Sequence, residues 1–462
     1  MRTLLAATLI TTALTGCQPP VVPPAETGEV EAVTAAATFI REDWSLPAPP
    51  GAAQPDLIAT TDGRLLLSWM EPDGDGHALK FASFQANVVD AIDGRQPALT
   101  KTAAAERWSS PRTIATGANW FVNWADTPHL AATDDGALWA HWLQKSAAAT
   151  YAYDVALVRS GNGGRTWSKP VLVNDDGKAV EHGFVSLWPA TRDTVGVSWL
   201  DGRNTRGAEH ADHLAIGSEP APDSIRGQAG QASTNSGQVR AMTLRAARFD
   251  AKLQRRDESE IDAMTCDCCQ TDVAVTARGP LLVYRDRTAE EIRDIAVTRG
   301  QGDAWTPPRL VHADGWKMPA CPVNGPAVAA RGNEAVVAWY TAPADVPMLR
   351  LARSNDAGDT FTAPVTVDQG AAVQGRVDVA LDTQSTWVLW VREEAAGQSL
   401  QLARYARDLS REPERIEVAK IEGRGRATGF PQLALSGAAL YVVWTDVVDG
   451  KPRLRGATLR RK

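Results

Sequence analysis

The chain has 462 residues, five of them cysteines, and a formal net charge of −7 at pH 7. Its acidic balance argues against a nucleic-acid partner, because DNA and RNA are bound through basic surfaces. The length is too great for one small core, yet no linker-like stretch divides the chain beyond residue 37.

The N-terminus has the features of an export signal. Residues 1–17, MRTLLAATLITTALTGC, combine a positive charge at Arg2 with a short apolar core and small residues at the end. The core is too short to span a bilayer as a structural helix. The segment Leu14-Thr15-Gly16-Cys17 resembles a bacterial lipobox, in which cleavage precedes the cysteine and Cys17 then carries lipid. A plain secretory signal with an incidental cysteine is the alternative.

Gln18 follows this cysteine where an Asp would favour the inner membrane, so we expect an outer-membrane lipoprotein that faces the periplasm or the outside. Residues 18–37 are rich in Pro, Ala and Glu and suit a flexible tether better than a packed element. We therefore expect a signal peptide at 1–16, a lipidated Cys17 and tether at 17–37, and a folded domain at 38–462. The protein would then contact the membrane only through its lipid anchor.

One pattern recurs along the rest of the chain: an apolar strand, a short Gly/Asp turn, and a second apolar strand that ends in an aromatic residue. Helical periodicity is nearly absent, and the strands are short and rich in Val, Leu and Trp. Repeats of this kind, about 50 to 90 residues apart, are typical of a β-propeller in which each copy supplies the inner two strands of a blade. The seven copies span residues 57–69, 129–142, 186–199, 273–284, 327–340, 379–390 and 433–444.

Two copies continue with a third strand and a further motif. Residues 160–167, SGNGGRTW, and 354–361, SNDAGDTF, fit the Asp-box pattern S-x-D/N-x-G-x-T-W/F, and residues 298–305, TRGQGDAW, are a degenerate copy. On these motifs the chain resembles the sialidase superfamily of Asp-box, or BNR-repeat, β-propellers over nearly all of its length after the tether. The Asp or Asn of such a box caps backbone amides and its aromatic residue packs between blades, so we interpret the boxes as structural.

The predicted fold class is all-β: a β-propeller of four-stranded blades, with seven blades favoured by the repeats and six implied by the resemblance. The chain ends in KPRLRGATLRRK, a third strand with no outer strand after it. The segment at 38–50, TFIREDWSLPAPP, is similar to the outer-strand beginnings at 108–111 and 167–170. We therefore expect the N-terminal segment to complete the last blade, which removes an exposed edge and locks the ring.

The propeller geometry gathers several unusual residues at one mouth of its central channel. The start of each inner strand and the loop between the second and third strands open on the same face. Arg203 and the string Arg285-Asp286-Arg287 follow second strands and belong to that face. The cysteines precede the inner strands of two neighbouring blades and should also meet there; they are Cys266, Cys268, Cys269 and Cys321.

Three interpretations of these cysteines stay open. In an oxidising compartment they can form a disulfide, most simply one that joins Cys321 to the 266–269 cluster and staples two blades. The C-x-C-C pattern with a distant cysteine, and with Met318 and His312 nearby, also offers soft ligands for Cu or Zn. The third alternative is a reactive or redox thiol beside Arg285 or Arg287.

Arginine grips carboxylates and phosphates in a bidentate manner, and several arginines are expected at this mouth. We predict that the mouth binds an anionic small molecule, a glycan or an envelope protein. The alternative for these residues is a solvated loop or ion pairing between blades. The ligand-binding candidates are Arg203, Tyr284, Arg285, Asp286, Arg287 and Arg293.

The resemblance to sialidases implies another function, exo-acting glycoside hydrolysis. Such enzymes hold the substrate carboxylate with three arginines, use a Tyr activated by a Glu as nucleophile, and use an Asp as acid/base. The first arginine of the family lies in a Phe-Arg-Ile-Pro segment, which residues 39–42, FIRE, do not match, so Arg41 is given no catalytic role. Residues of the right type elsewhere are Arg203, Arg285, Arg287 and Arg376 as grips and Tyr284 or Tyr340 as nucleophile. Binding at the channel mouth is the expected function, with glycoside hydrolysis and soft-metal binding as alternatives.

Overall fold

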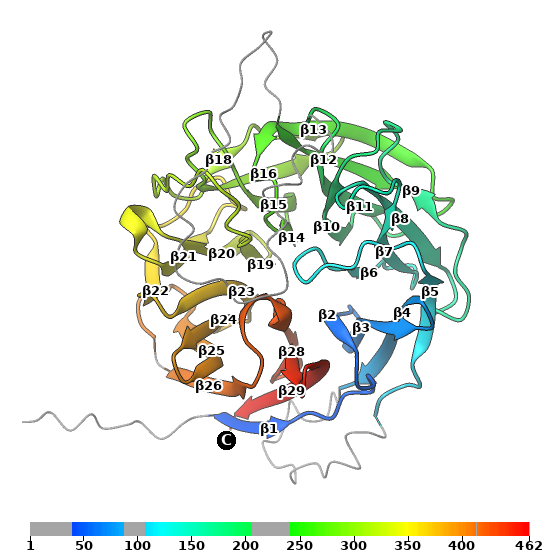
Figure 1. Ribbon diagram of the computed structural model, residues 1–462. Coiled ribbons are helices and arrows are strands. Elements are labelled where there is room, and N and C mark those ends of the chain that lie inside the picture. Colours follow the sequence, from blue (N-terminus) through cyan, green and yellow to red (C-terminus); the bar gives the residue numbers. More distant parts are fainter. Residues whose placement is uncertain (1–38, 87–106, 206–240, 413, 462) are drawn as a thin grey trace, which may run out of the picture. The chain divides into compact units, whose positions relative to one another are not determined.

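The computed structural model describes residues 39–86, 107–205, 241–412 and 414–461. Seven antiparallel sheets of these residues surround a central axis and form a seven-bladed β-propeller (Figure 1). The helical elements in this part of the chain are two short 3-10 turns, η3 (Pro343–Asp345) and η4 (Gly425–Thr428). The predicted all-β class, the four-stranded blades and the favoured count of seven are therefore confirmed.

The expected signal peptide at 1–16, the lipidation site Cys17 and the tether lie outside the described residues. Among the residues that are described, no helix has the length and apolar character needed to cross a membrane.

Each blade is a meander in which the strands are ordered from the innermost, at the channel, to the outermost, at the rim. The first three blades comprise β2 (Ala53–Ala59), β3 (Arg64–Asp73), β4 (Gly76–Gln85) and β5 (Arg112–Gly117); then β6 (Leu130–Ala132), β7 (Leu138–Lys145), β8 (Tyr153–Ser160) and β9 (Val171–Leu172); then β10 (His182–Pro189), β11 (Val195–Asp201), β12 (Met242–Phe249) and β13 (Arg255–Thr265).

The remaining blades follow the same order, except that in the fourth β18 (Arg309–Leu310) also pairs with the third strand. They comprise β14 (Asp272–Thr276), β15 (Gly279–Arg285), β16 (Ile295–Gln301) and β17 (Ala304–Trp305); then β19 (Ala327–Arg331), β20 (Glu334–Thr341), β21 (Met348–Ser354) and β22 (Val365–Gln369); then β23 (Val373–Leu381), β24 (Ser385–Glu394), β25 (Gly397–Ala406) and β26 (Glu414–Ile421); then β27 (Gln432–Ser436), β28 (Ala439–Val448) and β29 (Lys451–Arg461) with β1 (Phe39–Asp43).

The ring is closed by the two ends of the folded chain, as predicted. β1 is the outer strand of the seventh blade and runs antiparallel to β29, with Asp43 opposite Ala457 (Figure 1). The Phe39 ring also packs edge-on against Trp387 of the sixth blade, with centroids 4.9 Å apart. The N-terminal strand therefore covers the edge of β29 and contacts a second blade.

The aromatic residue that ends each repeat belongs to the core. All seven of these residues lie on second strands. The indole of Trp199 donates to Asp201 at 2.7 Å, and that of Trp339, next to the end of another repeat, donates to Asp314 at 2.7 Å. In these two blades an acid close to the tryptophan is part of the packing. The fully buried tryptophans are Trp69, Trp139, Trp199, Trp339 and Trp390.

Four aspartates join neighbouring blades around the channel; Asp56 and Asp126 are buried, and Asp272 and Asp378 are half-buried. Each carboxylate accepts the backbone N–H of a residue in the next blade's inner strand at 2.6–2.8 Å. These inter-blade aspartates hold the strands at a fixed spacing. The four pairs are Asp56 with Leu130, Asp126 with Phe184, Asp272 with Val328, and Asp378 with Leu433.

The two segments that match the Asp-box pattern lie between third and outer strands, where they were expected. Asn162 Oδ1 accepts the N–H of Thr166 at 3.0 Å, and Asp356 Oδ1 accepts the N–H of Thr360 at 2.8 Å. Trp167 packs edge-on against Phe81 of the preceding blade. Their side chains are thus engaged in turns and in contacts between blades.

Candidate functional site

The cysteines meet where the sequence places them, at the start of the fourth and fifth blades. Cys266, Cys268 and Cys269 lie in the turn between β13 and β14, and Cys321 lies between β18 and β19. The first three are 1–2% exposed, and Cys321 is half-buried. All four are free thiols, so the expected disulfide between the blades is not present in this structure.

The sulfur positions explain why these cysteines are unbonded. The three buried Sγ atoms lie within 4.8 Å of one another, and Cys266 Sγ is 3.0 Å from Cys269 Sγ. A disulfide needs about 2.05 Å, whereas two sulfur ligands of one tetrahedral zinc, each about 2.3 Å from the metal, lie about 3.8 Å apart. Cys321 interacts with Cys268 from the open side. The arrangement is three convergent thiols with a fourth at the edge.

A short ionic network covers the cluster. Arg293, which is 2% exposed, donates Nη1–H to Cys266 Sγ at 3.3 Å and Nη2–H to Glu291 at 2.8 Å. Arg287 donates to the same glutamate at 2.6 Å and to Asp267, inside the cysteine turn, at 3.2 Å. The structure therefore brings Arg287 and Arg293 together with the cysteines, as the sequence predicted.

The three buried thiols differ in the direction of their pKa shifts. Burial opposes ionisation of Cys266, but hydrogen bonds from Cys268 and Cys269 and the charge of Arg293 bring the pKa of its thiol well below the ordinary value. Burial, together with hydrogen bonding to Cys266, raises the pKa of both Cys268 and Cys269. One thiolate stabilised by two thiols is the favoured charge state.

Arg285 has a different place from the one expected of a ligand grip. Its side chain is 1% exposed and donates to the carbonyl oxygens of Asn324, Arg293 and Tyr340 at 2.7–3.0 Å. The guanidinium also lies over the Trp316 ring, 4.9 Å from its centroid. Since its donors are used by the main chain, Arg285 connects the fourth and fifth blades in this structure.

The other candidates also have partners within the protein. Tyr284 is fully buried and bonds to Asp262 at 2.5 Å. Burial and the charge of that aspartate raise the pKa of Asp286 to about 6. Arg203 forms a two-pronged contact with Asp201 at 2.7 and 2.8 Å. These residues lie outside the cysteine network.

Another part of the mouth combines Arg376, which the sequence offered as a carboxylate grip, with three residues that it did not single out, Trp124, Arg426 and Phe430. Trp124 stacks on Phe430, with centroids 5.8 Å apart, and the guanidinium groups of Arg376 and Arg426 lie 5.2 and 5.7 Å from its ring. Arg376 bonds to Thr428 at 2.7 Å and is buried, whereas Arg426 is exposed. The sequence signal that could have found Trp124 was its position, because it is an aromatic residue in a loop directly before an inner strand.

A tyrosine with two acids lies between the second and third blades. Tyr153 donates its O–H to Glu181 at 2.7 Å and is 3.4 Å from Asp126. Burial raises the pKa of Glu181 to about 8 and that of Asp126 to about 7. Tyr153, Glu181 and Asp126 therefore form a hydrogen-bonded group of one phenol and two carboxyls between these blades.

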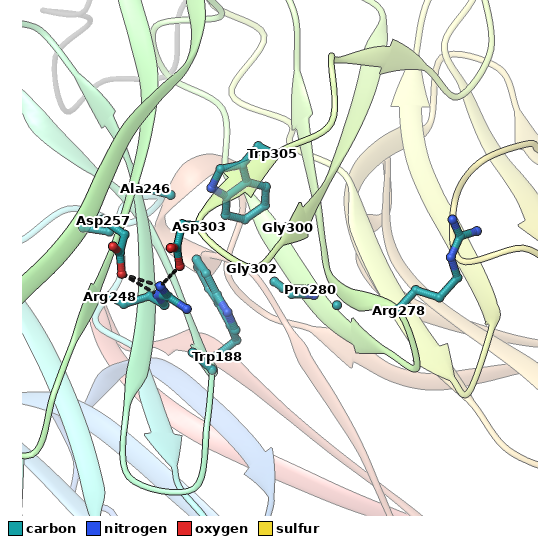
Figure 2. A pocket seen from close by; sticks show the side chains of 13 residues that line it. Trp188, Ala246, Arg248, Asp257, Arg278, Pro280, Gly300, Gly302, Asp303 and Trp305 are labelled. Carbon is teal, nitrogen blue, oxygen red and sulfur yellow. Dashed lines mark hydrogen bonds and ion pairs between the residues drawn. The ribbon is translucent and has the colours of Figure 1, made fainter.

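A cavity of about 210 Å³ lies on the opposite face, between the third and fourth blades (Figure 2). The rings of Trp188 and Trp305 meet edge-on beside it, with centroids 5.8 Å apart. Arg248 in its wall pairs with Asp257 and Asp303. This cavity shares no residue with the cysteine cluster.

No protein-family model and no curated protein matches the sequence. Solved structures with a similar trace include a protein of unknown function from Dyadobacter fermentans, at 13% identity over 92% of this chain and 100% of that one, with a TM-score of 0.45. Others are an α-L-arabinanase from Penicillium chrysogenum, at 11% identity over 91% and 97% with a TM-score of 0.44, and the NanB sialidase from Streptococcus pneumoniae, at 8% identity over 86% and 83% with a TM-score of 0.42. Identities this low do not carry a substrate or a reaction over to this chain.

Proposed function

We propose that this protein binds the soft monovalent ion Cu(I) through Cys266, Cys268 and Cys269. The observation that carries the proposal is the convergence of three buried, unbonded thiols within 4.8 Å. Thiolate ligands select Cu(I), zinc and iron–sulfur clusters over harder ions. A structural zinc ion takes four ligands, whereas the sulfur atoms that lie within 4.8 Å of one another belong to three thiols and not to Cys321. This favours an ion that binds three sulfur ligands.

The surroundings suit a thiolate-bound cation. The low-pKa thiol of Cys266 supplies the first negative sulfur, and Arg293 offsets part of the charge that further deprotonation adds. Half-buried Cys321 lies beside Cys268, where a metal ion can pass from an outer sulfur to the inner set. His312, which the sequence offered as a further ligand, is instead 2.8 Å from Asp314.

The test is Cu(I) binding by the reduced full chain under anaerobic conditions, followed by competition with a chromophoric Cu(I) chelator. We expect one copper per chain and a sulfur-to-copper charge-transfer band. Replacing Cys266, Cys268 or Cys269 with Ser should weaken binding by a factor of about 100, since each substitution removes a primary ligand. Cys321→Ser should weaken it less.

Met318→Leu serves as the matched control, because it removes the other soft side chain considered in the sequence and leaves the thiols in place. Retention of copper by all three cysteine variants would contradict the assignment of ligands. Zinc bound at one equivalent, with no retention of Cu(I), would contradict the choice of metal.

We also propose that this metal is held in the cell envelope. Support comes from the N-terminal sequence alone: the signal-like residues 1–16, the lipobox ending in Cys17 and the Gln18 that follows. Labelling with a radioactive fatty acid tests the anchor, and Cys17→Ser should abolish the label.

A second function rests on one observation at the same mouth, the exposed Arg426 beside the Trp124 ring. We propose that these side chains hold the carboxylate and the apolar face of an anionic sugar. Titration calorimetry with glucuronate and N-acetylneuraminate tests it, with Arg426→Ala expected to abolish binding. Arg424→Ala is the control, since Arg424 donates to the Ala395 carbonyl. Equal binding of these sugars by both variants would contradict the proposal.

A further inference from the structure

A second group of ligand-type side chains lies between the second and third blades and contains no cysteine. It consists of Asp176 in the β9–β10 loop, His182 at the start of β10, and Asp201 at the end of β11. One ligand atom from each residue lies within 4.8 Å of the others. His182 and Asp201 are 0% exposed, and the Asp176 side chain is 7% exposed.

The imidazole of His182 is held in a defined orientation. Its Nδ1 is 3.1 Å from the carbonyl oxygen of Tyr153 and 3.4 Å from the carboxylate of Asp154. When Nδ1–H donates to this carbonyl, the lone pair of Nε2 points away from it and into the acidic group. Metal-binding histidines are typically oriented by such a bond from their other nitrogen.

Two polar atoms of the group, one on His182 and one on Asp176, lack hydrogen-bond partners. Nε2 of His182 lies 3.0 Å from Asp176 Oδ1 without forming a hydrogen bond, and it is buried. Oδ2 of Asp176 is likewise buried and has no hydrogen-bond partner. Buried polar atoms without partners are rare, and an ion or a water molecule is a usual explanation. Atoms that lie close together without a hydrogen bond are expected when each points toward a third position.

The carboxylate of Asp201 is fixed from outside the group. Arg203 holds both of its oxygens, and the Trp199 indole donates to one of them at 2.7 Å. The carboxylates of Asp154, Asp176 and Asp201 all contact the His182 ring, whereas Arg203 pairs with Asp201 and with Glu258. This excess of carboxylates around the ring favours a cation.

We infer that Nε2 of His182, the carboxylate of Asp176 and Oδ1 of Asp201 form a binding site for a divalent first-row metal ion such as Mn²⁺ or Zn²⁺. Nitrogen and oxygen ligands about 2.1 Å from such an ion lie about 3.4 Å apart in tetrahedral geometry, and the observed separations of 3.0 and 3.8 Å from Nε2 bracket that value. One imidazole with carboxylates suits these ions better than Cu(I). Neighbouring residues 177–179 are exposed or half-buried, so water can supply the remaining ligands.

The competing explanation is a buried imidazolium. Burial disfavours the charged ring, but the neighbouring carboxylates of Asp154, Asp176 and Asp201 outweigh this effect and raise the pKa of His182 to about 9. The pocket thus attracts one positive charge, and the two explanations differ in whether a metal ion displaces the proton.

The experiment is titration of the metal-free full chain with Mn²⁺, followed by electron paramagnetic resonance of the unbound ion. Mn²⁺ is chosen because thiolates bind it poorly, so the result does not depend on the cysteine site. We expect one bound ion per chain and a loss of at least tenfold in affinity in Asp176→Asn. Asp175→Asn is the matched control, since Asp175 pairs with Arg255 and not with this group.

A chain that binds no Mn²⁺ at millimolar concentration overturns the inference, as does equal affinity in Asp176→Asn and Asp175→Asn. If His182→Gln does not fold, NMR of the wild-type ring decides: paramagnetic broadening of the His182 signals by Mn²⁺ supports the site. Sharp signals with both nitrogens protonated at saturating Mn²⁺ overturn it.

Discussion

Arg293 Nη1–H donates to Cys266 Sγ at 3.3 Å. Among the hydrogen bonds described for the cysteine sulfur atoms, it is the one whose donor is a guanidinium. The contact joins the β13–β14 turn to the loop between β15 and β16. It places a permanent positive charge beside one of three clustered thiols, where this charge adds to the hydrogen bonds from Cys268 and Cys269 in lowering the pKa of Cys266.

Arg293→Met should therefore raise the pKa of the Cys266 thiol. The expected result is a shift of the thiolate absorbance at 240 nm to higher pH by one unit or more, on the order of 1.4 kcal/mol of lost stabilisation per unit. Arg287→Met is the control, because Arg287 contacts Glu291 and Asp267 but no sulfur. Equal titration curves for the two variants would show that the guanidinium does not set the acidity.

Replacing Arg285 should destabilise the whole propeller. Arg285→Met leaves the carbonyl oxygens of Asn324, Arg293 and Tyr340 without their donor, at about 1–3 kcal/mol for each unsatisfied buried group. We expect a fall of about 3 kcal/mol or more in the free energy of unfolding, measured by urea denaturation. Arg64→Met, at an exposed position paired with Asp62, should change it by less than about 1 kcal/mol.

Stability should decline as pH rises toward neutrality. Burial raises the pKa of the Asp378 carboxyl from 3.8 to about 7 and that of Asp272 to about 6. A carboxyl with a higher pKa in the folded state binds more protons there, so its contribution is intact below pH 4 and is lost between about pH 4 and 7. Asp378→Asn does not titrate, and its stability relative to the wild type should increase over this range. A constant difference from pH 4 to 8 in urea unfolding would contradict the assignment.

Removing β1 should open the ring. A chain that begins after residue 43 exposes the edge of β29 and the Trp387 face that Phe39 covers. Exposed strand edges pair with other chains, so we expect aggregation on size-exclusion chromatography and a lower melting temperature. A chain that begins at residue 38 keeps β1 and is the control; similar behaviour of both would show that closure does not depend on this strand.

The fold could be predicted because its signals are local. Each repeat joins two apolar strands by a short turn, and the unpaired third strand at the C-terminus indicated how the ring closes. The same reasoning placed four cysteines at one mouth, since their positions before inner strands follow from the repeat itself.

The roles of the arginines could not be predicted in this way. Sequence shows that Arg285 follows a strand, but whether its donors meet solvent or carbonyl oxygens depends on the neighbouring blade. The same holds for the cysteines, because the choice between a disulfide and separate thiols depends on distances of about an ångström. The partners of His182 come from three separate segments and have no spacing signature.

Closure by β1 also bears on the order in which the molecule is assembled. The N-terminal strand leaves the ribosome first, yet its partner β29 is made last, so the circle cannot be completed until synthesis ends. The cysteines at 266–321 are available well before that moment. The segment that carries the thiols is therefore complete before the ring can close, so closure is the last step in assembling the molecule.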